Sequence, residues 1–330
     1  MVDSNSSVFE PYPGLRSPHA QTLAARALRA TLRSSYSRIR LFTIDEDFID
    51  LDMDDVIEAP RAVCLILHGL EGSSSSGYVL SACRSLARHG ILGVAMNFRS
   101  CSGEPNRTLG SYHAGRTDDI RLVLDWLVTR FPDSRRAVLG FSLGGNALLK
   151  YLGEAGETAK RQVAVATAIS VSFDLDSSAD AMERGMGRIY ARHFLRSLRR
   201  KAREKAGRFP GAFDVGALDR ARTVRAFDEA VTAPIHGFRD VDDYYGSCSS
   251  GQFLDRIRVP TVVIQSRDDP LVPGHTIPKI IERNGVVRGV ITDDGGHVGF
   301  LARGRRLEPD LWAEAHAARV IRDRLAQHGT

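Results

Sequence analysis

The sequence predicts an α/β fold with a mostly parallel central sheet flanked by helices. Continuous apolar runs recur along the chain, as in 62–67 (AVCLIL), and such runs are typical of strands that are buried on both faces of a sheet. Between these runs lie segments whose apolar residues have helical spacing, as in 117–131. Strands that alternate with helices in this way favour a parallel sheet covered by helices.

The expected elements follow one another in chain order. Ser17 is expected to cap an alanine-rich helix that begins at Pro18, because proline is favoured at the first helical position. Two short alternating strands are expected at 40–45 and 48–53. Buried strands are expected at 62–67, 91–98, 137–141, 163–171, 261–265 and 286–292, and further helices at 78–89, 117–131, 145–152 and 309–326.

The alternation of strands and helices is interrupted between residues 173 and 253. This interval holds a strongly basic helical segment, 191–208, and no clear buried strand. We therefore expect a helical cap inserted into the fold. The predicted organisation is an N-terminal arm and helix packing on the core (1–37), a core made of 38–172 and 254–330, and the cap (173–253).

Composition narrows the class of protein. The 330 residues carry 45 Lys or Arg against 40 Asp or Glu, a net charge of +5 that is too small to imply a nucleic-acid partner. No apolar run approaches the roughly 20 residues of a membrane span, and the N-terminal residues lack the pattern of a signal peptide. The four cysteines are scattered, so neither a disulfide framework nor a zinc site is expected. We expect a cytoplasmic protein without metal or cofactor.

Ser142 lies in a short glycine-rich turn between a predicted buried strand and a predicted helix. The sequence there is Gly-Phe-Ser-Leu-Gly-Gly, with Gly140 and Gly144 two residues on either side of the serine. A serine on such a sharp turn is held in a strained backbone conformation with its hydroxyl exposed, and small neighbours are needed because strand and helix nearly touch. Ser142 is therefore the candidate nucleophile.

An acid and a histidine follow the serine in the order that this arrangement requires. Asp268 and Asp269 come at the end of the predicted strand 261–265, and His297 follows the later strand behind two glycines. A serine hydroxyl needs such a base and a carboxylate that orients it. The two backbone N–H groups of an oxyanion hole are expected from Leu143, directly after the nucleophile, and from Leu70, in the loop after strand 62–67. His68, in the same loop, is expected to hold the loop by hydrogen bonds.

Several stretches together resemble the YheT-like branch of the α/β-hydrolase superfamily, which includes embryo-associated esterase-like proteins and abhydrolase-domain lipases. The resemblance covers about residues 10–325 and rests on the serine turn and on SPHAQTL, HGLEGSSSSGYV, NFRSCSGEPNR, SYHAGRTDDI and GGHVGF. It implies an α/β-hydrolase fold and a serine hydrolase of carboxylic esters or lipid esters, with no cofactor. It also implies that Ser142 is the nucleophile, His297 the base and Asp269 the acid, since the branch's acid sits three residues before the position of Val272. Ser100 departs from the glycine that is usual in this branch.

We interpret the chain as a serine esterase for short-to-medium acyl chains, with a small-molecule ester as its partner and lipid esters within its range. Two alternatives remain open: a non-catalytic ligand-binding protein of the same fold, and a thioesterase or lipase with a phospholipid substrate. A dehalogenase or an epoxide hydrolase would need aspartate at position 142. Asp268 also remains open as the triad acid.

Other residues invite a second interpretation. Cys101 could be a nucleophile, but no base is evident near it, which favours a small buried thiol. His113 and Asp118 could bind metal, but a structural role with the acids capping a helix is favoured. The basic cap segment could contact a membrane peripherally. The candidate walls of an acyl pocket in the cap are Met182, Met186, Phe194, Leu195 and Phe213.

Overall fold

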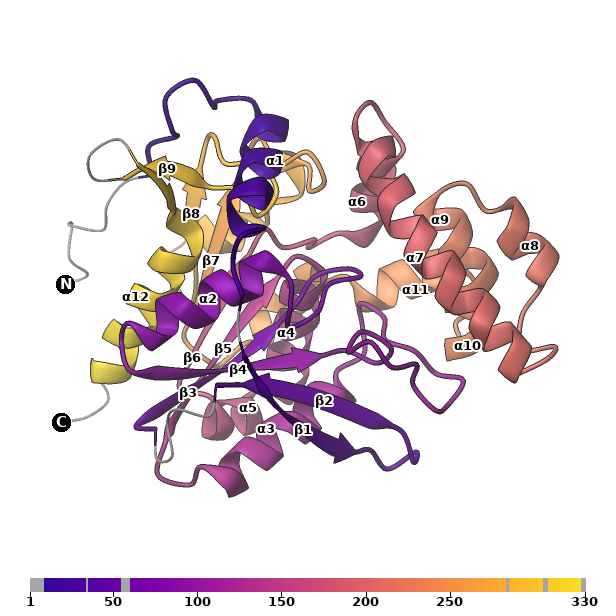
Figure 1. The fold of residues 1–330 in the computed structure, drawn as a ribbon, viewed down its shortest axis with the longest axis horizontal. Coiled ribbons are helices and arrows are strands. Elements are labelled where there is room, and N and C mark those ends of the chain that lie inside the picture. Colours follow the sequence, from indigo (N-terminus) through magenta and orange to yellow (C-terminus); the bar gives the residue numbers. More distant parts are fainter. Residues whose placement is uncertain (1–8, 34, 55–59, 283–284, 305–307, 328–330) are drawn as a thin grey trace.

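The computed structural model describes residues 9–33, 35–54, 60–282, 285–304 and 308–327. Its centre is an eight-stranded sheet in the order β1-β2-β4-β3-β5-β6-β7-β8 (Figure 1). The two pairings of β2 are antiparallel and the others are parallel, so the predicted mostly parallel sheet is confirmed. The strands are β1 (Ser37–Phe42), β2 (Phe48–Met53), β3 (Ala62–Leu67), β4 (Ile91–Asn97), β5 (Arg135–Phe141), β6 (Val165–Ile169), β7 (Thr261–Ser266) and β8 (Val287–Thr292).

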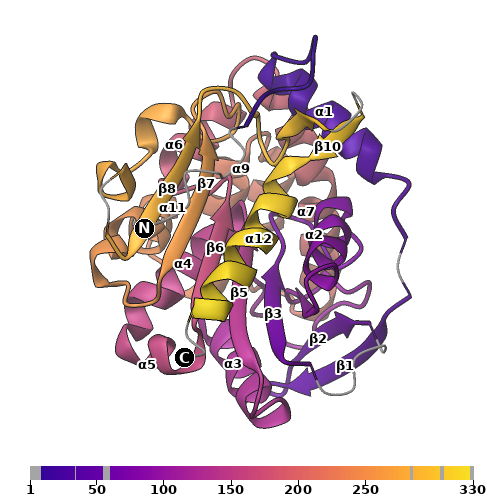
Figure 2. The ribbon, with the colours of Figure 1, turned by 90° about the vertical axis from the view of Figure 1, so that its left-hand side faces the viewer.

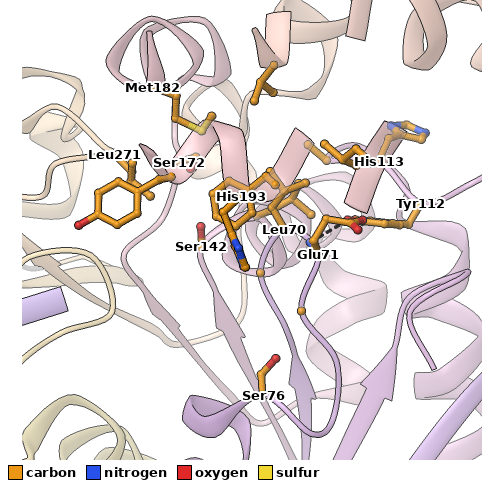
Figure 3. A pocket seen from close by; sticks show the side chains of 18 of the residues that line it. Leu70, Glu71, Ser76, Tyr112, His113, Ser142, Ser172, Met182, His193 and Leu271 are labelled. Atoms are coloured by element: carbon orange, nitrogen blue, oxygen red, sulfur yellow. Dashed lines mark hydrogen bonds between the residues drawn. The ribbon is translucent and has the colours of Figure 1, made fainter. Parts of the chain in front are cut away.

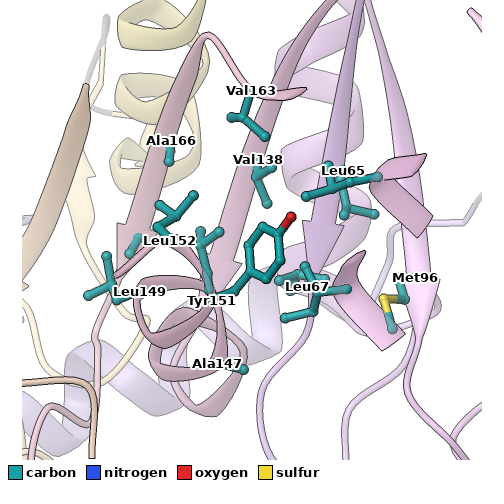
Figure 4. Packing of buried hydrophobic residues seen from close by; sticks show 14 of the residues in the cluster. Leu65, Leu67, Met96, Val138, Ala147, Leu149, Tyr151, Leu152, Val163 and Ala166 are labelled. Carbon is teal, nitrogen blue, oxygen red and sulfur yellow. The ribbon is translucent and has the colours of Figure 1, made fainter. Parts of the chain in front are cut away.

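Helices cover both faces of the sheet because alternate residues of the central strands point to opposite sides. Leu65 and Leu67 of β3 pack with the helices α3 (Asp118–Arg130), α4 (Leu143–Ala155) and α5 (Glu157–Gln162) (Figure 4). Cys64 and Ile66 face the opposite side, where α2 (Gly77–Ala87) and α12 (Trp312–Gln327) lie (Figure 2). The first helix, α1 (Pro18–Arg29), packs on α2.

The interval between β6 and β7 is helical and gathers to one side of the sheet (Figure 1). Its long helix α7 (Gly187–Arg208) packs on the shorter ones around a small core of its own, which includes Leu195, Leu218 and Phe227. Within the described ranges, no helix of the chain is both long and apolar enough to cross a membrane. The helices of this insertion are α6 (Leu175–Met182), α7 (Gly187–Arg208), α8 (Val215–Arg220), α9 (Val224–Phe227), α10 (Ala233–His236) and α11 (Val241–Cys248), joined by the π-helical turn η1 (Asp228–Thr232) and followed by the 3₁₀ segment η2 (Ser250–Arg256).

Five local features differ from the prediction. The last helix begins at Trp312 instead of residue 309, because β10 (Pro309–Leu311) pairs with β9 (Leu301–Arg303). The first strand lies three residues earlier than expected. Helix α5 was not predicted, and strand β6 ends at Ile169 because Ser170 has a positive φ of 53°. Ser17 precedes α1 as expected, but its side chain makes no capping hydrogen bond.

Candidate active site

Ser142 occupies a strained turn between β5 and α4. Its φ of +51° and ψ of −119° lie in a region that residues other than glycine rarely adopt. The turn is held by the Ser142 N–H, which donates to the carbonyl of Ile169 at 2.9 Å, and by the Ser142 carbonyl, which accepts from the N–H of Asn146 at 3.0 Å. These hydrogen bonds hold the strained serine at the carboxyl edge of the sheet, where the loops after the parallel strands meet.

The glycines beside the serine are required by contact with backbone. A Cβ on Gly140 would come within 2.8 Å of the Cα of Gly145, and a Cβ on Gly144 would come within 2.3 Å of the carbonyl oxygen of His68. Both distances are shorter than real Cβ contacts, so any side chain would force strand and helix apart. The tight approach expected at this turn is thus present.

His297 lies between Ser142 and Asp269. Its Nε2 is 3.0 Å from Oγ of Ser142, and its Nδ1 is 2.9 Å from Oδ2 and 3.1 Å from Oδ1 of Asp269. The carboxylate of Asp269 is fully buried, and its Oδ1 also accepts from the N–H groups of Leu271 and Val272 at 2.9 and 3.0 Å. The three side chains form a continuous hydrogen-bonded chain in which Asp269 is well placed to orient the imidazole.

Asp268 points to a different partner. Its Oδ1 accepts from the N–H of Gly296 at 2.9 Å, so it fixes the loop that carries His297 without contacting the imidazole. Burial raises the pKa of this carboxyl above its ordinary value. Of the two adjacent acids, only Asp269 therefore contacts the imidazole of His297, a distinction that the sequence did not make.

Helix α1 holds the histidine loop from the other side. Thr22 Oγ1 accepts from the backbone N–H of His297 at 2.9 Å, and Arg29 donates to the carbonyl of Val298 at 2.7 Å. A Cβ on Gly296 would come within 2.3 Å of the carbonyl oxygen of Pro18, so glycine is required for this approach. The sequence motif SPHAQTL gave no indication of this role, because the contacts join residues about 275 positions apart.

In the loop after β3, the two N–H groups on either side of Leu70 are hydrogen-bonded to tyrosines. The N–H of Gly69 donates to Oη of Tyr78 at 2.9 Å, and the N–H of Glu71 donates to Oη of Tyr112 at 2.8 Å. Among the described residues, nothing accepts from the N–H of Leu70 between them or from that of Leu143. The two tyrosines were not singled out in the sequence.

Close contact between the two loops brings these donors to the serine. A Cβ placed on Gly69 would lie 3.1 Å from Cβ of Ser142. Leu143 is the first residue of α4, so its N–H has no partner within the helix and adds to the positive end of the helix dipole. An oxyanion hole needs two such N–H donors beside the nucleophile.

His68 fixes the same loop through hydrogen bonds to backbone groups. Its Nδ1 is 2.7 Å from the carbonyl oxygen of Gly69, and its Nε2 accepts from the N–H of Phe98 at 3.1 Å. Complete burial lowers its pKa to about 4, so the ring is neutral, with Nδ1 as donor and Nε2 as acceptor. The role expected for His68 from the sequence agrees with these contacts.

A cavity of about 500 Å³ opens above Ser142 and extends beneath the cap (Figure 3). Core residues Leu70, Leu143 and Leu271 line its base, and Met182 and Phe194 line its cap side. The other three wall residues expected from the sequence were wrong: Met186 is exposed on the surface, whereas Leu195 and Phe213 belong to the core of the cap. Further apolar lining comes from Leu198, Val224, Phe227, Val231 and Ile235 of the cap.

A buried polar cluster closes one end of the cavity. Lys201 of α7 donates to Oε1 of Glu71 at 2.9 Å, and Oη of Tyr112 donates to the same oxygen at 2.7 Å. Lys201 Nζ also lies 3.4 Å from Sγ of Cys101. Burial raises the pKa of the Cys101 thiol to about 11, which leaves it a poor nucleophile.

His113 and Asp118 do not approach one another as ligands of one ion. The His113 ring packs on His236 with centroids 4.4 Å apart, and Asp118 pairs with Arg116 at 3.1 Å. No group of three or more metal-binding side chains occurs in the part of the chain that the structure describes. The expected capping of α3 by its acids is wrong, because the carboxylate of Asp119 pairs with arginines, including Arg99 at 2.8 Å.

Ser100 adopts the backbone conformation that a glycine would favour. Its φ is +63°, and its Oγ donates to Oδ1 of Asn106 at 2.5 Å and accepts from the Asn106 N–H at 3.0 Å. The side chain closes the loop by these hydrogen bonds, which compensate for the strain of a serine at this position.

Comparison with known proteins gives a consistent result. Residues 63–303 match the family model of the alpha/beta hydrolase fold. The YheT protein of Escherichia coli (strain K12), which is named as an esterase, is 37% identical over 318 residues, covering 94% of this chain and 92% of YheT. Phospholipase ABHD3 of Mus musculus is 29% identical over 290 residues, covering 85% of this chain and 70% of ABHD3.

A yeast lipase and an archaeal esterase extend the likeness. Monoacylglycerol lipase of Saccharomyces cerevisiae is 32% identical over 258 residues, covering 76% of this chain and 56% of the lipase. The solved structure of esterase Pf2001 of Pyrococcus furiosus superposes with a TM-score of 0.54 at 18% identity, covering 89% of this chain and 92% of that one. At this identity the superposition shows a shared fold.

Proposed function

Because the chain belongs to the alpha/beta hydrolase fold family and to its YheT-like branch, and is a carboxylic ester hydrolase, we propose that it works through a Ser142–His297–Asp269 triad and an acyl-enzyme. The observation that carries this proposal is the unbroken chain of contacts from Oγ of Ser142 through both nitrogens of His297 to the carboxylate of Asp269. A ligand-binding protein that had lost catalysis would not need this alignment or the strain at Ser142.

The geometry suggests a role for each group. His297 Nε2 takes the proton from Ser142 as Oγ attacks the ester carbonyl, and the Asp269 carboxylate keeps Nδ1 protonated and stabilises the imidazolium. The N–H groups of Leu143 and Leu70 stabilise the oxyanion, each contributing about 2.7–4 kcal/mol in the transition state. His297 then protonates the leaving alcohol. Water attacks the acyl-Ser142 ester by the same route and releases the acid.

We propose short-to-medium acyl esters as the preferred substrates. A cavity of about 500 Å³ with a mainly aliphatic cap side accommodates an acyl chain of several carbons, and each buried methylene contributes about 0.8 kcal/mol. The names of two relatives, a monoacylglycerol lipase and a phospholipase, support lipid esters as an extension of this range. A cytoplasmic location is also proposed, since all four cysteines are unpaired and buried.

Labelling by a fluorophosphonate probe tests the proposed nucleophile. The wild-type chain should be labelled on Ser142, and Ser142→Ala should remain unlabelled although it folds. A panel of p-nitrophenyl esters of increasing acyl length then measures the substrate range. Labelling of Ser142→Ala at the wild-type rate would contradict the proposal, and so would ester hydrolysis by that variant.

A further inference from the structure

Helix α7 carries an excess of positive charge beside the cavity. Its 22 residues include nine Arg or Lys and a single acid, Glu204. One stripe of the helix, containing Tyr190, Phe194 and Leu198, lines the cavity. The adjacent stripe has the spacing i, i+3, i+7, i+10, i+14 and is exposed throughout; it consists of Met186, Ile189, His193, Arg196 and Arg200.

Helix α1 forms the facing lip of the cavity. Leu23, Arg26 and Arg33, on α1 and just after it, line the cavity and are exposed. Contact between the two lips is direct, because Nδ1 of His19 lies 3.2 Å from Oη of Tyr190. Partial burial lowers the pKa of His193, and the charges of Arg26 and Arg196 lower it further. The two lips therefore share one electrostatic environment.

We call these exposed residues the mouth surface: Leu23, Arg26 and Arg33 on one lip, and Met186, Ile189, Arg196 and Arg200 on the other. Its aliphatic side chains are well exposed, with 47% of Leu23, 40% of Met186 and 62% of Ile189 accessible to solvent. Among the described residues, no carboxylate pairs with Arg26, Arg196 or Arg200. Exposed aliphatic side chains and arginines without a carboxylate partner therefore alternate around the entrance of a largely apolar cavity.

We propose that the mouth surface docks on an anionic lipid bilayer and places the cavity entrance against it. Arginines bind anionic head groups, and aliphatic side chains between them insert at the boundary with the acyl chains. The choice of a lipid surface over a nucleic acid follows from Leu23, Met186 and Ile189, since aliphatic side chains add nothing to phosphate-backbone binding. This role rests on the proposed ester hydrolysis, since docking would let ester lipids enter the cavity directly from the bilayer.

Vesicles of ether-linked lipids test docking separately from catalysis, because an esterase cannot cleave them. The full-length chain is sedimented with dialkyl phosphatidylglycerol or dialkyl phosphatidylcholine vesicles. We expect at least tenfold stronger binding to the anionic vesicles, weakened by 0.5 M salt. Each arginine near an anionic surface contributes about fivefold to binding, so Arg196→Gln/Arg200→Gln should bind about 25-fold more weakly.

Two further variants make the test specific. Arg121→Gln/Arg161→Gln removes two exposed arginines, one on α3 and one on α5, and neither arginine lines the cavity. This variant should bind anionic vesicles as tightly as wild type does. Ile189→Ser should weaken vesicle binding about tenfold, through lost apolar burial. Equal binding to both lipids would overturn the proposal, as would equal losses in the two double variants. Loss through the arginines alone, with equally tight binding to duplex DNA, would identify a general polyanion site and also overturn it.

The two proposals can fail separately. Arg196→Gln/Arg200→Gln should hydrolyse soluble p-nitrophenyl butyrate at the wild-type rate, because neither arginine lines the cavity above Ser142. A chain that binds anionic vesicles but hydrolyses no ester would contradict the proposed triad and leave docking standing. A chain that hydrolyses the soluble ester but ignores anionic vesicles would contradict docking alone.

Discussion

Lys201 of the cap helix α7 donates a hydrogen bond to Oε1 of Glu71, the residue that directly follows the proposed oxyanion donor Leu70. The N···O distance is 2.9 Å, and the Glu71 side chain is 5% exposed. Glu71 also has a positive φ of 54°, and Oη of Tyr112 contacts both its N–H and its carboxylate. The cap and the oxyanion loop are thus joined through one buried carboxylate.

Lys201→Met should lower kcat about tenfold with a smaller change in KM. Without its cation, the buried Glu71 carboxylate is expected to shift and carry the Leu70 N–H away from the oxyanion position. One such donor is worth about 10²–10³ in kcat, and a displaced donor should lose part of that.

Glu71→Gln/Lys201→Met, which leaves no unpaired charge, should recover stability. Arg203→Met is the matched control, because its ion pair with Asp219 is exposed and contributes little. A variant that changes only KM would indicate that Lys201 merely lines the cavity.

Ser142→Ala should abolish ester hydrolysis while the fold survives. Alanine removes the nucleophile but keeps the Cβ that the turn already accommodates. The melting temperature should stay within a few degrees of wild type, since His297 is the only hydrogen-bond partner of the Oγ in the part of the chain that the structure describes. Turnover and thermal melting measured on the same preparation check this. Substantial turnover by the folded variant would rule out a serine nucleophile.

The two neighbouring aspartates should behave very differently. Asp269→Asn is expected to lose on the order of 10⁴-fold in kcat, because an amide in that position favours the wrong tautomer of His297. Asp268→Asn should lose much less, since its side chain contacts the Gly296 N–H and not the imidazole. The kcat values of both variants, with circular dichroism as a check on folding, decide between them. If Asp268→Asn were the inactive variant, the assignment of the acid would be wrong.

Local sequence patterns predicted the buried strands and the turn at Ser142 because their causes are local. The run AVCLIL became β3 without change, since six apolar residues in succession have no other place than the middle of the sheet. The glycines around Ser142 indicate close backbone contact in any strand–turn–helix unit. The acid and the histidine each follow a predicted strand, and these strands come after the serine turn along the chain. Their order can therefore be read from the sequence.

Long-range contacts were not predictable in the same way. The support that Thr22 gives to His297 joins two ends of the chain, and nothing in the residues near Thr22 encodes its partner. Tyr78 and Tyr112 likewise occupy the N–H groups beside Leu70 only because the fold brings them there. Of the five cap residues predicted to line the cavity, only Met182 and Phe194 do so. The sequence of an amphipathic helix shows which residues are apolar, but not which of them face the substrate.

The free energy of unfolding should fall by about 2 kcal/mol per buried neutral histidine between pH 7 and pH 5. His68 has a pKa of about 4 in the folded chain, below the ordinary value of 6.5. The unfolded chain therefore takes up a proton in this window that the folded chain does not, so stability is full above about pH 6.5 and is lost as the pH falls toward 4.

Urea unfolding of His68→Gln at the two pH values isolates this contribution. The variant should lose about 2 kcal/mol of the pH dependence, whatever its absolute stability. His316→Gln is a matched second case, because burial also lowers the pKa of His316 to about 4. Full wild-type pH dependence in both variants would show that other groups account for acid destabilisation.

Ester hydrolysis should rise from acetate to medium acyl chains and should not depend on metal. The cavity of about 500 Å³ is far larger than an acetyl group, and Met182 and Phe194 on its cap side offer an adaptable apolar surface. Two more methylenes, if fully buried, contribute about 1.6 kcal/mol, so kcat/KM should rise by up to about 15-fold per two carbons until the chain fills the space. Phe194→Ala should flatten this dependence for longer chains and leave acetate almost unchanged, whereas Val215→Ala, on the exposed surface of the cap and away from the cavity, should change neither. A chain-length series measured with and without EDTA tests these expectations together. Activity that peaks at acetate would show that acyl chains do not enter the cavity beneath the cap, and activity lost to the chelator would show that the triad does not act alone.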